Sequence, residues 1–335
     1  MRIDLLPASG NDYKANLHTH STFSDGKFTV EELKELYKKE GYAIVAFTDH
    51  DILIPHPELA DENFLPLNSF EVEITQTASE QPVGPRRKTC HLCMIALEPD
   101  NVTQPCWHRS AYQFGNAKGY RDRVQFDESL PDFVRTYSGE CVNEFIRISR
   151  EKGFFVTYNH PTWSQESYPE YIRYRGMNAM EMTNSSCLAM GYDEHNERVY
   201  DDLLRAGQRI FCLCTDDTHS AKDLFGGWTM IRAPRLAYRE VTSALERGEF
   251  YCSEGPVIRD LYVEDGKVTV TTEGAREIRV MRGLRRAGIA RASDAPLTEA
   301  TFQLYAEDGY FRITVEDFAG RRAYTNAYFT DTLGL

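Results

Sequence analysis

Hydrophobic and polar positions divide this chain into strand-like and helix-like stretches. The strand-like stretches are short and nearly continuous apolar runs, as expected for strands covered on both faces. The runs lie at residues 14–20, 42–48, 65–75, 90–97, 154–158, 178–183 and 209–214. The pattern predicts a strand at each of these places.

Helix-like stretches, in which apolar residues recur every three to four positions, separate several of these strands. The first begins at Thr29, where Thr29-Val30-Glu31-Glu32 forms a capping box, and ends at Gly41. Others are predicted at residues 141–152, 194–206 and 238–247. Strands that alternate with helices predict a mainly parallel α/β fold.

After Pro256 the pattern changes to short strands with turns such as Asp265-Gly266 between them. The predicted strands lie at residues 257–263, 267–272, 277–281, 301–306, 310–316 and 322–330. We therefore expect two domains, an α/β domain at 1–255 and a small antiparallel β-domain at 256–335. Residues 98–138 form a long, weakly periodic insertion rich in aromatic residues and arginine, and an insertion of that length is usually functional or carries its own small structure.

Metal-ligand residues stand where the predicted strands end. His18 and His20 close the first strand and, being two residues apart, can turn to the same point. The second strand ends in Asp49-His50-Asp51. Imidazole suits zinc, iron and manganese, and carboxylate suits manganese and magnesium. Two successive strands that finish in such residues predict a metal site at one end of a sheet.

The full ordered set resembles the polymerase-and-histidinol-phosphatase (PHP) superfamily of metal-dependent phosphoesterases. The motifs that carry the resemblance are H-T-H, S-D-G, T-D-H, E-V-E-I-T, a lone His91, N-H-P and D-D-T-H, in register over residues 14–256. The resemblance implies a distorted seven-stranded (β/α)7 barrel, with the small β-domain after it. His91 stands at the start of its strand, as expected if the third and fourth strands are antiparallel.

The resemblance also implies two or three divalent metal ions, drawn from manganese, iron and zinc. Glu73 would bridge two ions, because a carboxylate has two oxygens; Glu71 and Asp216 are the alternatives to Glu73 and Asp217. Asp217, His219 and Glu73 are expected to be catalytic as well as metal-binding. The implied ligands are His18, His20, Asp25, His50, Glu73, His91, His160, Asp217 and His219.

Arginines in two loops are candidate substrate-binding residues. They are Arg86, Arg87, Arg109, Arg121 and Arg123. Arginine binds phosphoryl oxygens in a fork, but a solvated charge run or a locally packed insertion would show the same pattern. With these groups, a hydroxide that bridges the metals would attack phosphorus in line.

Composition narrows the class of protein. The net charge of −13 over 335 residues argues against general binding of nucleic acid or anionic membranes. The N-terminal residues lack a signal-like apolar segment, and no run is long enough to span a membrane, so we expect a cytoplasmic protein. The eight cysteines are expected to be reduced and mostly buried.

The sequence thus predicts a phosphoesterase for a small phosphomonoester, a nucleotide bisphosphate or a short oligonucleotide. The expected partner is a small phosphorylated substrate, with no stable nucleic-acid partner and no membrane; the oligomeric state is open. Two alternatives share the metals: hydrolysis of a carboxylic ester, amide or carbamate, and a regulatory module that binds metal without catalysis.

Overall fold

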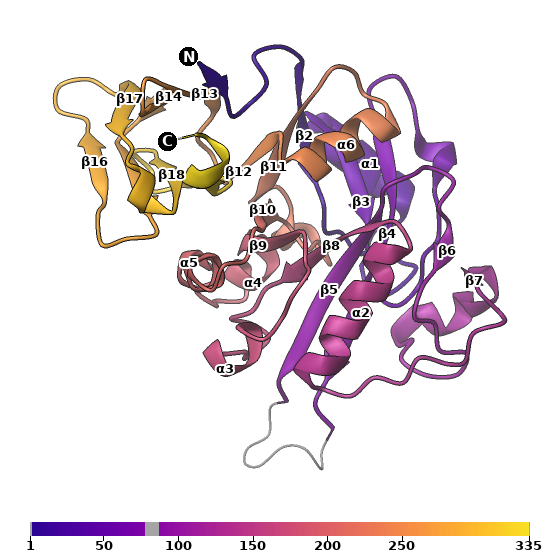
Figure 1. Cartoon of the computed structure of the whole chain (residues 1–335). Coiled ribbons are helices and arrows are strands. Elements are labelled where there is room, and N and C mark those ends of the chain that lie inside the picture. The colour runs from indigo at the N-terminus through magenta and orange to yellow at the C-terminus, as the bar shows by residue number, and fades with distance from the viewer. Residues whose placement is uncertain (1, 78–86, 335) are drawn as a thin grey trace.

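A computed structural model describes residues 2–77 and 87–334 of the chain (Figure 1). A row of parallel and antiparallel strands forms its main part, in the order β2-β3-β4-β5-β8-β9-β10. All seven predicted strands are present, and the chain is a mixed α/β protein with a large sheet. Their bounds are Asn11–Asn16, Tyr42–Phe47, Leu65–Thr75, Thr89–Ala96, Phe154–Asn159, Ala179–Asn184 and Phe211–Thr215.

One strand of this row runs against the others. Strand β5 is antiparallel to both of its neighbours, β4 and β8, whereas the other neighbouring pairs in the row are parallel. The amino end of β5 therefore lies beside the carboxyl ends of the other strands. This confirms the predicted antiparallel pairing of the third and fourth strands, and it explains why His91 stands near the start of β5.

The two ends of the row meet beyond β2 and β10. Thr19 and Thr218 form a parallel bridge, and the backbone nitrogen of His20 donates to the Thr218 carbonyl over 2.9 Å. The backbone nitrogen of Asp217 donates in turn to the His18 carbonyl, also over 2.9 Å. The first and seventh strands thus continue into segments that are hydrogen-bonded to each other.

Helices pack against the row where the periodicity predicts them. Helix α1 begins after the capping box of Thr29 and Glu32, and Gly41 follows it with a left-handed φ of +78°. The alternation of strand and helix is incomplete, since a single 3-10 turn (Pro57–Leu59) connects β3 to β4. The α-helices are α1 (Val30–Lys39), α2 (Gly139–Glu151), α3 (Tyr168–Tyr171), α4 (Ser185–Ala189), α5 (Glu197–Arg205) and α6 (Tyr238–Arg247).

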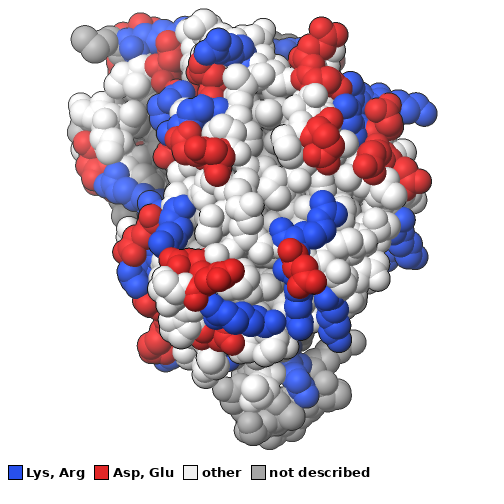
Figure 2. All heavy atoms as spheres, turned by 90° about the vertical axis from the view of Figure 1, so that its right-hand side faces the viewer, with Lys and Arg blue, Asp and Glu red and all other residues white. Residues whose placement is uncertain are grey.

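The insertion at 98–138 carries a small structure of its own. Two short parallel strands, β6 (Thr103–Gln104) and β7 (Gln125–Phe126), flank a 3-10 segment at Gly115–Arg123. On the face that includes these strands, acidic and basic side chains are interspersed (Figure 2). Among the described residues, no helix is long and apolar enough to cross a membrane.

Two strands that the sequence did not predict connect the row to the C-terminal strands. β11 (Trp228–Ala233) pairs with β2, and β12 (Phe250–Ser253) pairs with β11 and with β19 (Arg322–Thr325). The other C-terminal strands are β13 (Ile258–Glu264), β14 (Lys267–Ala275), β15 (Glu277–Arg282), β16 (Gly288–Arg291), β17 (Leu297–Gln303), β18 (Tyr310–Glu316) and β20 (Tyr328–Phe329).

The C-terminal strands pack around an apolar core of their own, which includes Leu261, Val270 and Ile313. The first residues of the chain belong to this part, because β1 (Ile3–Asp4) pairs with β13 and Leu6 is buried in the same core (Figure 1). The division of the chain at residue 255 stays a prediction. A unit cut there would lack the strand contributed by the N-terminal residues.

Candidate metal centre

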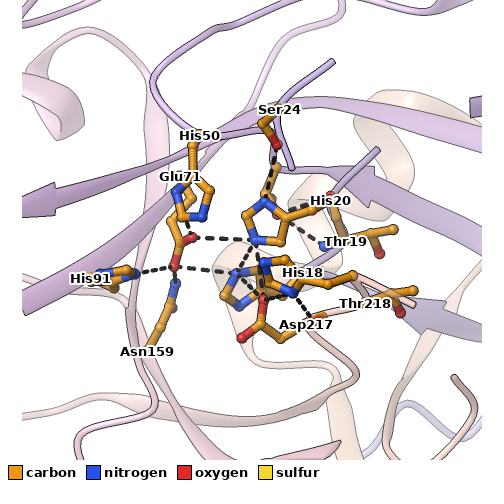
Figure 3. Close-up of polar contacts among 12 residues, drawn as sticks. His18, Thr19, His20, Ser24, His50, Glu71, His91, Asn159, Asp217 and Thr218 are labelled. Atoms are coloured by element: carbon orange, nitrogen blue, oxygen red, sulfur yellow. Dashed lines mark hydrogen bonds and ion pairs between the residues drawn. The ribbon is translucent and has the colours of Figure 1, made fainter. Parts of the chain in front are cut away.

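His18 and His20 lie at the meeting point of the first and seventh strands. Both side chains are buried, and their Nε2 atoms are 3.1 Å apart (Figure 3). The bridge between Thr19 and Thr218 keeps this segment extended, so residues 18 and 20 project to the same side, as alternation requires. At least one of the two facing nitrogens carries a lone pair directed at the other ring.

A first group of possible ligands surrounds His20. Its ligand atoms, together with those of Asp25, His50 and His219, all lie within 4.8 Å of one another. The turn that presents Asp25 needs glycine next, because a Cβ on Gly26 would lie 2.3 Å from the His20 carbonyl oxygen. Asp49 fixes the same turn by accepting hydrogen bonds from Ser21 and Ser24, rather than orienting His50.

Glu71, not Glu73, lies at the centre of the site. Its carboxylate lies within 3.4 Å of nitrogens of His18, His20, His50, His91 and His160 (Figure 3). The Glu73 carboxylate approaches only His91 among these, over 3.6 Å, and is 36% exposed. This corrects the expectation that Glu73 is the central carboxylate.

The reason for the correction is strand register. Glu71 and Glu73 share one face of β4, so alternation alone does not separate them. The parallel bridge of His50 to Glu71 places residue 71 beside the end of β3, and Glu73 pairs with His91 farther along β4. Strand β4 continues past its neighbour, and Glu73 therefore lies at the rim.

Asp217 lies in the cluster and Asp216 does not. One oxygen of Asp217 is 3.1 Å from Nε2 of both His18 and His20. Asp216 turns away and accepts hydrogen bonds from the Tyr37 hydroxyl and from the backbone of Phe225 and Gly226. Burial raises the pKa of Asp216 to about 6. Asp216 therefore organises the following loop.

Three buried residues that the sequence did not assign to the site hold its members in place. Asn159 donates to Glu71 over 2.9 Å, and Asn184 donates to Asp217 over 3.1 Å. Glu181 lies 2.7 Å from Nδ1 of His18 and accepts from the backbone nitrogen of His160. Asn159 and Asn184 stand directly after predicted strands. Glu181 lies within one, and a charged residue inside an otherwise apolar run is the signal that could have found it. Such outer contacts fix the orientation of metal ligands.

The electrostatics of the cluster follow from packing imidazoles against carboxylates. Burial opposes protonation of His20, but hydrogen bonds to Asp217 and Glu71 raise its pKa to about 10. Burial and the nearby charge of His20 lower the pKa of His50 to about 3. Burial would raise the pKa of Glu71, but the charges of His18 and His91 hold it well below its usual range. The cluster thus holds ionised carboxylates beside imidazoles, of which His50 keeps a lone pair and His20 takes up a proton. A bound metal ion would take the place of such a proton.

A divalent metal ion fits this set of donors. Nδ1 of His50 and Nε2 of His91 are buried without a hydrogen-bond partner among the described residues. Buried polar atoms are rarely left unpaired, and bound cations would satisfy these two. Other compact groups are His18 with Glu71 and Cys93, His18 with His160 and Asp217, and Glu71 with His91 and His160. His56, His108 and His195 are not members of these groups.

A cavity of about 480 Å³ opens onto the cluster. Phe114 from the insertion, Trp163 and Met190 give it apolar walls. Among the described residues that line it, the basic ones apart from the histidines are Lys27 and Lys222. Neither lysine was predicted, since an isolated lysine in a loop carries no sequence signal.

The predicted arginines that the structure describes do not line this cavity. Arg109 pairs with Asp132 over 2.7 Å, Arg121 donates to Gln113 over 2.8 Å, and the Arg123 guanidinium lies over the Phe23 ring. Arg87 is exposed, and Arg86 lies outside the described residues. The arginines of the insertion are thus held by neighbours in the fold, which does not support their assignment as substrate-binding residues.

Comparison with known proteins finds a family match in the N-terminal part of the chain. A family model described as the PHP domain matches residues 16–137, a range that contains His18, His20, Asp25, His50, Glu71 and His91. This part of the chain, about a third of its length, is thus similar to the PHP domain. A segment of 37 residues is also 51% identical to the DNA polymerase/3'-5' exonuclease PolX of Bacillus subtilis (strain 168). That segment is 11% of this chain and spans only 6% of the PolX protein.

The solved structures that resemble this chain are more distant in sequence. A two-domain protein from Bacteroides vulgatus, said to contain a predicted PHP-like metal-dependent phosphoesterase, is 14% identical with a TM-score of 0.46; the match covers 97% of this chain and 98% of that one. An amidohydrolase from Chromobacterium violaceum is 16% identical with a TM-score of 0.37, over 62% of this chain and 88% of that one.

Proposed function

We propose that this protein is a metal-dependent hydrolase of phosphoric esters. The observation that carries the proposal is the cluster around Glu71 and Asp217, which opens onto a cavity that Lys27 and Lys222 help to line. Clustered cations and two lysines suit a substrate with a concentrated negative charge. A small phosphomonoester, a nucleotide bisphosphate or a short oligonucleotide has such a charge.

The proposal includes two or three ions of manganese, iron or zinc, held in a distorted seven-stranded barrel. The meeting of the first and seventh strands at Thr19 and Thr218 supports such a closed arrangement. Glu71 takes the central position that was expected for Glu73. The proposed ligands are therefore His18, His20, Asp25, His50, Glu71, His91, His160, Asp217 and His219.

Bound cations would supply an activated water and neutralise the charge that develops on phosphorus-bound oxygens. The chain's own residues do the rest. Lys27 and Lys222 attract and orient the phosphoryl group, and Phe114, Trp163 and Met190 limit the water around it. Asn159 and Glu181 keep Glu71 and His18 in fixed orientations, so the donors are arranged before substrate arrives.

The deciding experiment compares p-nitrophenyl phosphate with p-nitrophenyl acetate as substrates of the manganese-loaded protein. Phosphate ester should be cleaved, and inorganic phosphate should inhibit competitively. Alanine at Lys27 or Lys222 should raise KM for the phosphate ester about tenfold, which corresponds to roughly 1.4 kcal/mol. Lys267→Ala, in β14 of the C-terminal part, is the matched control and should change nothing.

Turnover of the acetate alone, without inhibition by phosphate, would replace this proposal by the carboxylic ester alternative. Metal uptake without either activity would favour the non-catalytic module. The cytoplasmic location and the absence of nucleic-acid and membrane partners stay predictions from the sequence.

A further inference from the structure

Arg135, in the last part of the insertion, contacts the chain segments that carry the proposed ligands His50 and Glu71. Its side chain is 4% exposed. Nη1 donates to one oxygen of Asp51 over 3.1 Å, and Nη2 donates to the other oxygen of the same carboxylate. Nη1 also donates to the backbone carbonyl of Glu73 over 2.9 Å. One guanidinium thus connects the end of β3 to β4.

Asp51 is directly joined to two proposed ligands. It follows His50 in the chain, and its backbone nitrogen donates to the Glu71 carbonyl over 2.7 Å. Its backbone has a left-handed φ of +59°, which a residue with a side chain adopts only when its surroundings hold it there. Its carboxylate is fully buried, and Arg135 is its ion-pair partner among the described residues.

Other residues of the insertion hold the same turn and hold Arg135 itself. Gln104 donates to the Asp51 carbonyl over 3.1 Å and accepts from the backbone nitrogen of Leu53 over 2.7 Å. The Tyr112 hydroxyl accepts from the backbone nitrogen of Arg135, and the guanidinium lies 4.2 Å from the centre of the Tyr112 ring. The insertion is therefore built onto the turn that carries His50.

We propose that Arg135 is a positioning residue for the metal centre, which fixes His50 and Glu71 relative to each other through Asp51. The proposal rests on the metal binding in the proposed function, but not on the reaction or its substrate. Removal of the guanidinium leaves a buried carboxylate without a counter-charge beside His50. It also frees the backbone of β4 at Glu73, two residues beyond Glu71.

The test measures metal affinity by chelator competition with Mn²⁺, together with Tm. Arg135→Met should weaken manganese binding ten- to a hundredfold, as outer contacts of metal ligands usually do, and should lower Tm. Arg135→Lys keeps the charge but loses the fork, so it should fold well and still bind manganese more weakly. The double variant Asp51→Asn/Arg135→Met removes both charges and should regain Tm without regaining affinity.

A second buried pair of the same form provides the control. Arg312, which is 1% exposed, binds Asp201 through two nitrogens over 2.9 and 3.0 Å, but it connects β18 to α5, and neither residue is a proposed ligand. Arg312→Met should lower Tm and leave the manganese affinity of the folded protein unchanged.

Two results would overturn the inference: a lowered Tm with unchanged affinity in the Arg135 variants, or wild-type protein that takes up no manganese. A protein that binds manganese as described but hydrolyses no phosphate ester would refute the proposed function and leave the role of Arg135 standing.

Discussion

The ligand end of the seven-strand row and the C-terminal strands both bury polar side chains, but they satisfy them in different ways. In the C-terminal part, Arg312 meets Asp201 and Glu197 with matched donors and acceptors. At the ligand end, imidazoles and carboxylates converge, and atoms of His50 and His91 have no hydrogen-bond partner among the described residues. The paired groups are satisfied within the fold, whereas a bound cation would satisfy the unpaired ligand atoms.

The largest effect should come from the central carboxylate. Glu71→Gln replaces an anion that faces five histidines, so we expect manganese affinity and any turnover to fall more than a hundredfold. Glu73→Gln, at the rim of the same strand face, should cost about tenfold or less. Metal titration of the two variants checks this; the opposite ranking would restore Glu73 to the centre.

Neighbouring aspartates should separate metal binding from stability. Asp217→Asn should abolish tight metal binding, because this carboxylate faces His18 and His20. Asp216→Asn should leave affinity within about tenfold but lower the free energy of unfolding by about 1–3 kcal/mol, since several buried donors lose an ionised acceptor. Urea unfolding and metal titration on both variants would show whether the two roles are exchanged.

The buried carboxylate of Glu166 should make the stability of the fold depend on pH. Burial raises the pKa of Glu166 to about 7, although the hydroxyls of Tyr158, Tyr174 and Tyr137 donate to it. The folded protein holds the proton of Glu166 more tightly than the unfolded chain does. Its contribution to the free energy of unfolding is therefore fully present below about pH 4.5 and is lost as the pH rises through about 7. The wild type should lose about 1–3 kcal/mol relative to Glu166→Gln over that window. Parallel unfolding curves at each pH would contradict this.

The smallest effect is expected for a histidine outside the cluster. His195 lies between Asp193 and Glu254, at 3.0 and 3.2 Å, and is partly exposed. The hydrogen bond to Glu254 raises its pKa, so the ion pair stabilises the fold at low pH and fades as pH rises. His195→Gln should cost less than about 1 kcal/mol and leave the metal content unchanged. Loss of metal would place this residue in the site after all.

Short-range patterns were the part of the site that the sequence could predict. His18 and His20 project together because they are two residues apart on an extended segment, and the predicted strands follow from apolar runs. The choice of Glu71 over Glu73 depends on the register between β3 and β4, which no local pattern contains. For the same reason, the sequence did not predict β11 and β12, which pair with β2 and β19, strands far from them in the chain.

The surroundings of the lysines and arginines were predicted less well than the metal ligands. The sequence pattern around an arginine does not show whether it faces a substrate or a neighbour such as Asp132. Arg109 was therefore assigned to the wrong environment. Arg135 gave no signal, because its partner Asp51 is 84 residues away. Lys27 and Lys222 line the cavity only because distant loops converge there.

The pairing of β1 with β13 has a consequence for the order in which the chain can fold during synthesis. Ile3 pairs with Val263, and Leu6 packs with strands that come still later. Residues 3–6 are therefore made long before their partners and stay unpaired until β13 and the strands after it have been made. Contacts this distant in sequence close slowly. On stalled ribosomes, a protease should cut residues 2–10 of a nascent chain that stops at residue 255, and spare them once residues 256–334 have emerged.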